Sequence, residues 1–257
     1  MRIARFTTGE DPRYGILDED SHELVVLRSD PIFAGLETTG ERVALDAVRL
    51  LSPVIPRSKV IGIGRNYADH AAEMGNEVPA EPLVFLKPNT SVIGPDDPIV
   101  LPPWSREVHH EAELAVVISR LCKYVPASKA QDVIFGYTVA NDVTARDVQA
   151  TDAQWTRAKG FDTSCPLGPY LAVDLDVSDL AVRARVDGVV RQDGRTSDLV
   201  HKVPELIEYV SSIFTLLPGD VILTGTPAGV GPIDVGQRVE VEVEGIGSFS
   251  NPVVRRD

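Results

Sequence analysis

Two glutamates at the start of an apolar, β-branched segment constrain the fold of this chain more than any other feature. Residues 114–118 read Leu-Ala-Val-Val-Ile, which is typical of a strand buried on both faces. Side chains alternate between the faces of a strand, so Glu111 and Glu113 point the same way. Two like charges beside a buried strand are costly unless a cation lies between them. Because a hard divalent cation with oxygen ligands is the simplest solution, the pair predicts a metal site.

A third ligand can come from Asp142, which follows the apolar strand predicted over residues 134–140. The alternative is that Asp142 caps a helix starting near Val143. Glu111, Glu113 and Asp142 would form an all-oxygen set, which favours Mg²⁺ or Mn²⁺ over Zn²⁺. His109 shares the face of the two glutamates, and we expect it to pack beside the site rather than bind the metal.

An acid/base pair is indicated by His70 and Glu73, which lie three residues apart on a short helix predicted over residues 68–74. A histidine oriented by a carboxylate can act as a general base near neutral pH. The alternative is an exposed surface pair. Glycine and proline in residues 75–79 suggest that the segment is a mobile lid.

Two lysines and one glycine-rich segment could add positive charge or hydrogen-bond donors to such a site. Lys87 follows an apolar strand, and Lys159 lies in a short polar segment; each could bind a substrate carboxylate or an enolate oxygen, or be a surface lysine. Residues 224–231 contain exposed backbone amides and two threonines that could bind an oxyanion. Residues 62–64 lack the third glycine of a dinucleotide loop and predict a tight turn instead.

The order of the elements predicts a β-rich α+β fold. Strands dominate from Val60 onward, Asp187-Gly188 predicts a hairpin, and residues 203–214 predict a helix opened by Pro204. A regular βαβ alternation is missing from the pattern, which argues against a doubly wound fold. Prolines near residue 55 indicate a boundary, so we expect a small N-terminal β domain at residues 1–55 and a catalytic domain at residues 56–257.

Composition narrows the partners and the compartment. The formal net charge of −13 repels nucleic acid and anionic membranes, so we expect neither as a partner. The two cysteines are far apart, which favours free thiols in a reducing compartment. We find neither a signal peptide nor an apolar run of the ~20 residues that span a bilayer, and we expect a cytoplasmic protein.

Six segments together resemble the fumarylacetoacetate hydrolase family, and they occur in the order typical of that family. They cover residues 64–70 (Gly-Arg-Asn-Tyr-Ala-Asp-His), 85–88, 110–114, 141–149, 158–162 and 224–231. The first fifty residues resemble the variable small N-terminal domain of bacterial members. Each segment alone is unspecific, whereas their joint occurrence is highly specific.

The resemblance implies a fold and a set of roles. The fold is a mixed β-sandwich roll, usually in a homodimer, with Mg²⁺ or Mn²⁺ held by Glu111, Glu113 and Asp142. His70 and Glu73 would form the acid/base dyad on a lid. The substrate would be surrounded by Lys159, Gln149, Arg65, Lys87 and Thr226. The nearest branch contains acylpyruvases, oxaloacetate decarboxylases and 2-hydroxyhepta-2,4-diene-1,7-dioate isomerases, and we expect substrate choice to depend on the lid and the N-terminal domain.

The expected function is therefore that of an enzyme acting on a small 2-oxo or 2-hydroxy-enol (di)carboxylate. A metal-stabilised enolate would serve C–C bond hydrolysis, decarboxylation or keto-enol and double-bond isomerisation alike. A metal-dependent carboxylate-binding protein without turnover is the alternative. A metal phosphatase ranks last, because the sequence contains no second metal cluster for the usual two-metal site.

Overall fold

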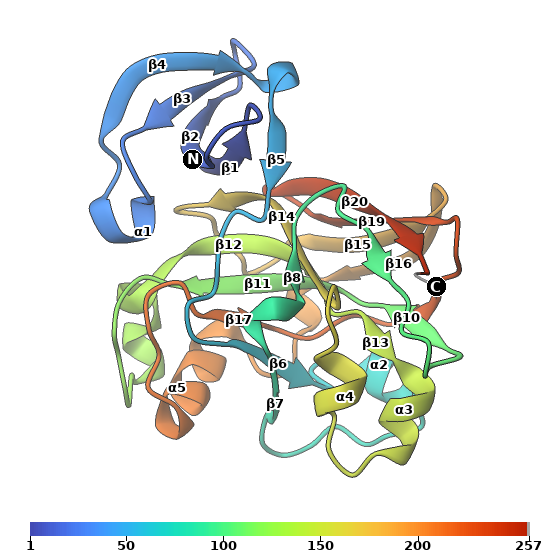
Figure 1. The fold of residues 1–257 in the computed structure, drawn as a ribbon. Coiled ribbons are helices and arrows are strands. Elements are labelled where there is room, and N and C mark those ends of the chain that lie inside the picture. Colours follow the sequence, from blue (N-terminus) through green and yellow to red (C-terminus); the bar gives the residue numbers. More distant parts are fainter. Residues whose placement is uncertain (256–257) are drawn as a thin grey trace.

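Three β-sheets organise the computed structural model, which describes residues 1–255 (Figure 1). The largest sheet has twelve strands and the order β4-β3-β2-β1-β14-β12-β11-β17-β6-β7, with β5 paired to β1 and β8 paired to β14. Its strands are β1 (Arg2–Thr7), β2 (Arg13–Asp18), β3 (Glu23–Leu27), β4 (Thr38–Ala44), β5 (Arg49–Leu51), β6 (Val60–Gly64), β7 (Leu83–Lys87), β8 (Val92–Ile93), β11 (Ala112–Ile118), β12 (Ile134–Asn141), β14 (Cys165–Ala172) and β17 (Val221–Leu223).

Two smaller sheets and several short helices complete the described chain. The five-stranded sheet has the order β16-β15-β19-β20-β9 and the three-stranded sheet the order β13-β10-β18. Their strands are β9 (Ile99–Val100), β15 (Ala181–Val186), β16 (Val189–Arg195), β19 (Arg238–Val243), β20 (Gly247–Val254), β10 (Val108–His110), β13 (Thr144–Ala145) and β18 (Gly231–Pro232). The α-helices are α1 (Pro31–Ala34), α2 (Ala68–Glu73), α3 (Arg146–Thr151), α4 (Thr156–Lys159) and α5 (Val203–Ile213), and 3₁₀ segments are η1 (Leu45–Ala47), η2 (Asn89–Ser91), η3 (Ala127–Val133) and η4 (Thr196–Asp198).

The core lies between the large sheet and the five-stranded sheet, and β11 runs through its centre. Leu114, Val116 and Ile118 on one face of β11 pack in the same apolar cluster as residues of β15 and β19. Ala115 and Val117 on the other face join a second cluster. Both faces of β11 are therefore covered, as its uninterrupted apolar sequence predicts. The β-rich α+β class and the mixed sandwich expected from the sequence are confirmed.

The N-terminal strands belong to the same sheet as β11, β12 and β14. β1 pairs antiparallel with β14, with Arg2 opposite Ala172, and carries β2, β3 and β4 outward from that edge (Figure 1). The division of the chain between residues 55 and 56 stays a prediction. Its physical basis is that residues 52–59 contain no strand and connect β5 to β6.

Several local predictions are confirmed. Helix α5 spans Val203–Ile213 and has Pro204 in its first turn, and α2 spans Ala68–Glu73. β15 and β16 form a hairpin whose two turn residues, Asp187 and Gly188, have φ angles of 50° and 80°, as a type I′ turn requires. Among the residues described, we find no helix with the length and apolar character needed to cross a membrane.

A buried ion pair holds the parallel strands β6 and β17 in register. Val221 pairs with Val60, and the residues just before them, Asp220 and Lys59, are joined by a 2.5 Å Nζ–Oδ2 contact. The Asp220 carboxylate, which is 0 % exposed, also accepts from the backbone N–H groups of Lys59 (3.1 Å) and Leu217 (2.9 Å). This ion pair matters for function because β6 and β17 both end beside the pocket described below.

We expect Asp220→Ala to lower the free energy of unfolding by about 3–5 kcal/mol, because it leaves the partly buried Lys59 ammonium without its countercharge and two backbone N–H groups without their acceptor. Urea unfolding followed by circular dichroism measures the loss. Asp193→Ala is the matched control, since its ion pair with Arg183 is 62 % exposed on the aspartate side. It should cost about 1 kcal/mol or less. Equal losses in the two variants would contradict the pinning role.

Candidate active site

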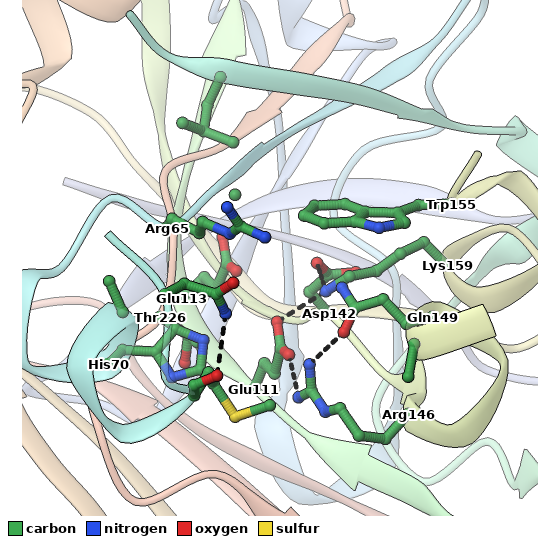
Figure 2. A pocket seen from close by; sticks show the side chains of 16 residues that line it. Arg65, His70, Glu111, Glu113, Asp142, Arg146, Gln149, Trp155, Lys159 and Thr226 are labelled. Carbon is green, nitrogen blue, oxygen red and sulfur yellow. Dashed lines mark hydrogen bonds and ion pairs between the residues drawn. The ribbon is translucent and has the colours of Figure 1, made fainter. Parts of the chain in front are cut away.

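A pocket of about 370 Å³ opens where β6 and β12 end and β11 begins, with α2 on one side and α3 and α4 on the other (Figure 2). It gathers most of the residues that the sequence singles out, from segments up to 161 positions apart. Those that line it are Arg65, His70, Glu111, Glu113, Asp142, Gln149, Lys159 and Thr226. Glu73 and Lys87 are not among the described lining residues. Glu73 contacts His70 and Lys87 contacts Asp142, and both of these partners line the pocket.

Strand pairing brings the three carboxylates together. Ala112 on β11 lies opposite Asn141 on β12, so Asp142 falls beside Glu111, and the Asp142 N–H donates to the Glu111 carbonyl (2.8 Å). Glu111, Glu113 and Asp142 are at most 3 % exposed. One oxygen from each lies within 4.8 Å of the others, which is the spacing of ligands around one ion. Asp142 precedes β13 rather than a helix, so the alternative of an N-cap is wrong.

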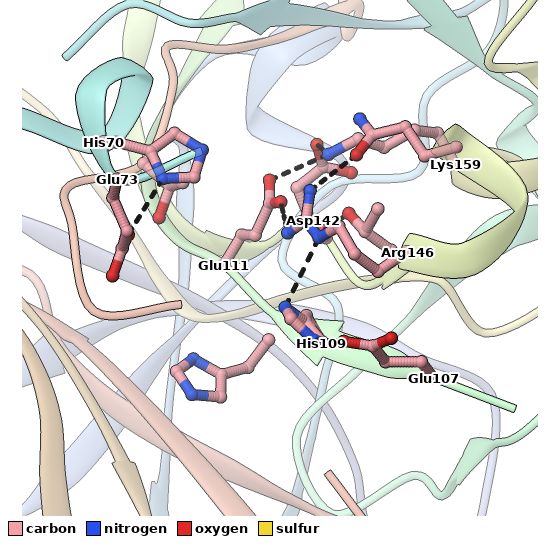
Figure 3. Close-up of polar contacts among 12 residues, drawn as sticks. His70, Glu73, Glu107, His109, Glu111, Asp142, Arg146 and Lys159 are labelled. Atoms are coloured by element: carbon pink, nitrogen blue, oxygen red, sulfur yellow. Dashed lines mark hydrogen bonds and ion pairs between the residues drawn. The ribbon is translucent and has the colours of Figure 1, made fainter. Parts of the chain in front are cut away.

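Buried cations hold two of these carboxylates (Figures 2 and 3). Lys159 Nζ lies 2.8 Å from Glu111 Oε2 and 2.6 Å from Asp142 Oδ2, and Lys87 Nζ lies 2.5 Å from Asp142 Oδ1. Arg146 donates from Nη2 to the remaining oxygen of Glu111. Lys87 therefore reaches the site through Asp142.

Glu113 is the exception among the three carboxylates. Within residues 1–255 it takes part in no ion pair, and Glu113 Oε2 accepts from the Gly225 N–H at 2.7 Å. Burial and then the charges of Asp142 and Glu111 raise the pKa of Glu113 well above its usual range. Burial acts in the same direction on Glu111, but the charges of Lys159 and Arg146 outweigh it and lower the pKa of that carboxyl.

The carboxylate set fits a divalent cation. It offers only oxygen ligands, which suits Mg²⁺ or Mn²⁺ better than Zn²⁺. In the part of the chain that the structure describes, Glu113 has no ion-pair partner of its own, and a divalent ion among the three carboxylates would supply a countercharge. Glu111, Glu113 and Asp142 would hold such an ion.

His70 and Glu73 form the contact expected from their spacing on α2 (Figure 3). His70 Nδ1 lies 3.4 Å from Glu73 Oε2. Burial lowers the pKa of His70 below its ordinary value, so the imidazole is neutral near pH 7. Both oxygens of Glu73 also accept from the Gly229 N–H at 3.1 Å, which ties the dyad to the segment after β17.

Arg146 is a site residue that the residue-level reasoning missed, although it lies inside the matched segment 141–149. Its Nη1 donates to Gln149 Oε1 (2.6 Å) and its Nε to His109 Nδ1 (3.3 Å), while His109 Nε2 contacts Glu107 Oε1 at 2.8 Å (Figure 3). As expected, His109 packs beside the metal set. The three-residue spacing of Arg146 and Gln149 on α3 is the signal that could have found this pair.

Trp155 forms an aromatic wall that the sequence does not reveal. Figure 2 shows its indole beside Arg65 and Lys159. Gly64 allows the indole to approach, because a Cβ atom there would lie 2.7 Å from the ring. Helix α2 and the residues after it contribute Ala71, Met74 and Asn76 to the lining. The described lining residues begin at Ile63, so the N-terminal region contributes none of them.

Comparison with known proteins places this chain among enzymes of one family. The model for the fumarylacetoacetate (FAA) hydrolase C-terminal domain matches residues 59–254, and that for an Rv2993c-like N-terminal domain matches residues 1–53. The chain is 47 % identical over 205 residues to the mitochondrial oxaloacetate tautomerase FAHD1 of Arabidopsis thaliana, covering 77 % of this chain and 92 % of the relative. It is 43 % identical over 195 residues to the mitochondrial oxaloacetate decarboxylase of Dictyostelium discoideum, covering 73 % and 89 %.

Two solved structures extend the comparison to the fold. The 5-carboxymethyl-2-hydroxymuconate delta-isomerase of Mycobacterium smegmatis superposes over 100 % of both chains with a TM-score of 0.92 and 50 % identity. The fumarylpyruvate hydrolase of Pseudomonas aeruginosa, solved with Mn²⁺ and pyruvate, has a TM-score of 0.74 and 33 % identity over 81 % of this chain and 92 % of that one. This chain is therefore an enzyme of the fumarylacetoacetate hydrolase family.

Proposed function

We propose that this enzyme acts on a small 2-oxo or 2-hydroxy-enol dicarboxylate through an enolate, with Mg²⁺ or Mn²⁺ bound by Glu111, Glu113 and Asp142. The observation that carries the proposal is the convergence of three buried carboxylates and Lys159 in one pocket that also contains His70. The relatives that are named tautomerase, decarboxylase, isomerase and hydrolase support the same class of chemistry. We also expect a cytoplasmic homodimer.

The charges of the site favour a dianionic substrate. Three carboxylates are matched by four cationic side chains in or beside the pocket, namely Lys87, Lys159, Arg146 and Arg65. A bound divalent ion supplies positive charge at the oxygen of an enolate. The site would then be net positive inside a protein of net charge −13, which attracts a substrate with two carboxylates despite the global field.

Lys159 is suited to stabilise negative charge that develops on the substrate. Its ammonium is buried, and although burial lowers the pKa, the charges of Asp142 and Glu111 outweigh this and raise it. The group therefore remains protonated through the neutral range. A donor fixed in a water-poor site stabilises a developing oxyanion more strongly than the same donor in water. We assign Arg65, Gln149 and Thr226 to substrate binding, and Lys87 to holding Asp142.

His70 would move the proton, with Glu73 orienting the imidazole. Its neutral form can activate water for hydrolysis or shift a proton in isomerisation. Decarboxylation needs no water nucleophile, because loss of CO₂ gives the enolate directly. Replacement of His70 should therefore slow hydrolysis and isomerisation more than decarboxylation.

Asp142→Asn tests the metal assignment. The change keeps the shape of the side chain but removes the charge of one ligand, so we expect the Mn²⁺ dissociation constant to rise by about 100-fold and turnover of any substrate to fall by about 10²–10³. Calorimetric titration and steady-state kinetics measure the two effects. Asp152→Asn, which changes a surface ion pair with Arg157, should leave both unaltered. Full turnover by Asp142→Asn, or by protein stripped with EDTA, would refute the metal mechanism.

His70→Ala separates the reactions. Because the dyad serves water activation, we expect hydrolysis of an acylpyruvate to fall by about 10²–10⁴ while decarboxylation of oxaloacetate changes by less than about tenfold. Both rates are measured on the same preparation, with the exposed His22→Ala as the control. Equal loss of both activities would contradict this division of roles. Binding of substrates by the wild-type protein without conversion of any of them would favour a binding protein instead.

The pH dependence of hydrolysis should report His70. The neutral base is lost as pH falls through the pKa, and burial lowers that pKa, so the acid limb should have its midpoint below about 6.5. Protonation of the carboxylate ligands would affect both reactions, and it cancels when kcat/KM for hydrolysis is divided by kcat/KM for decarboxylation. This ratio should rise with pH through the His70 midpoint and then level. A ratio that stays flat down to the lowest pH at which the enzyme remains folded would exclude His70 as the base.

A further inference from the structure

We propose that Gln192 is a positioning residue that fixes the metal ligands and Thr226 from outside the pocket. The inference rests on the proposed function, because it assigns Gln192 to that same site. Gln192 lies on β16, in the five-stranded sheet, and is 0 % exposed. It is about 80 positions from the glutamates in the sequence, yet its amide reaches the backbone between them.

The side-chain amide of Gln192 uses all of its hydrogen-bonding capacity. Oε1 accepts from the Ala112 N–H (2.9 Å) and from His110 Nδ1 (3.1 Å). Nε2 donates to Thr226 Oγ1 (2.7 Å) and to the Pro227 carbonyl (2.8 Å). The Ala112 N–H can only donate and the Pro227 carbonyl can only accept, so the orientation of the amide is fixed.

These four bonds bracket the metal ligands. His110 and Ala112 stand on either side of Glu111, and Ala112 lies between Glu111 and Glu113. The Thr226 hydroxyl completes a ring by donating to the Ala112 carbonyl at 2.8 Å. Because Thr226 Oγ1 accepts from Gln192 and donates to Ala112, rotation of its hydroxyl is fixed where it lines the pocket.

The glycine-rich loop, residues 224–231, connects the hydrogen bonds of Gln192 to the other side of the site. Its Gly225 N–H donates to Glu113 and its Gly229 N–H donates to Glu73. The loop is pressed against β16: a Cβ atom on Gly194 would lie 2.4 Å from Pro227, and one on Gly229 would lie 2.1 Å from the Arg191 carbonyl. Gln192 is thus a link between the second sheet and a loop that contacts a metal ligand, the substrate space and the dyad.

Two substitutions separate the donated from the accepted bonds. Gln192→Met keeps the volume but removes all four bonds, and Gln192→Glu keeps the two bonds accepted by Oε1 while losing at least one of the two bonds donated by Nε2. Asn251→Leu is the matched control, because Asn251 on β20 of the same sheet is 1 % exposed and donates to the Gly94 and Asp97 carbonyls (2.9 and 2.8 Å), away from the described pocket lining. Thermal unfolding identifies a temperature at which each variant is fully folded.

The primary readout is titration of each folded variant with Mn²⁺ alone. Loss of groups that orient metal ligands typically weakens metal binding by about 10–100-fold, and we expect a change in this range for Gln192→Met. Gln192→Glu should bind Mn²⁺ more tightly than Gln192→Met and should raise KM more than it lowers kcat, because its lost bond is on the Thr226 side. Asn251→Leu should bind Mn²⁺ within about twofold of wild type, even if its thermal stability falls as far as that of the Gln192 variants.

Three results would overturn the proposal. The first is that both Gln192 variants have the Mn²⁺ affinity and the KM of the wild type. The second is an equal change in Asn251→Leu, which would make the effect one of stability. The third is failure of both Gln192 variants to fold while Asn251→Leu folds, which would make Gln192 purely structural. A wild-type protein that binds Mn²⁺ but converts no 2-oxo acid would refute the proposed function alone, since the Mn²⁺ titrations would still decide the role of Gln192.

Discussion

Burial of three carboxylates at one point is the constraint on which the rest of this structure depends. Removing an ion from water costs several kcal/mol even after relaxation, and Glu111, Glu113 and Asp142 are almost fully buried together. The chain compensates with Lys87, Lys159 and Arg146, which are themselves buried. Because removal of one buried cation would leave a carboxylate without its countercharge, these positions cannot be changed independently. The cluster therefore needs a rigid frame.

The β-sandwich provides that frame. β11 and β12 fix Asp142 beside Glu111 through backbone hydrogen bonds, which do not depend on side-chain identity. The five-stranded sheet covers the face of β11 that carries Leu114, Val116 and Ile118. It also contributes Gln192, whose amide accepts from the backbone N–H of Ala112, between the two glutamates. The same packing that excludes water from the core thus keeps the ligands converged and strengthens every electrostatic interaction among them.

Patterns that repeat locally could be predicted from the sequence, and contacts across the fold could not. The period of two around Glu111 and Glu113, the turn at Asp187-Gly188 and the apolar face of α5 are each written in fewer than fifteen consecutive residues. The pairing of β1 with β14, the bonds of Gln192 to His110 and Ala112, and the Glu73–Gly229 contact join segments more than seventy positions apart. Local periodicity does not determine which distant strands meet, so these emerge only from the assembled sheets.

One part of the site lies on the large sheet and the elements next to it, and the other part lies on α2. The three carboxylates lie on or next to the ends of β11 and β12, Lys87 ends β7 and Lys159 ends α4. All of these side chains are buried, so packing leaves them little freedom. His70 and Glu73 lie on α2, a helix of six residues, too short to be stable by itself. Its position therefore depends on tertiary contacts, among them the bond from the Gly229 N–H to Glu73. Since the glycine-rich loop also contacts Glu113 through Gly225, the position of α2 is physically linked to the carboxylate cluster through that loop.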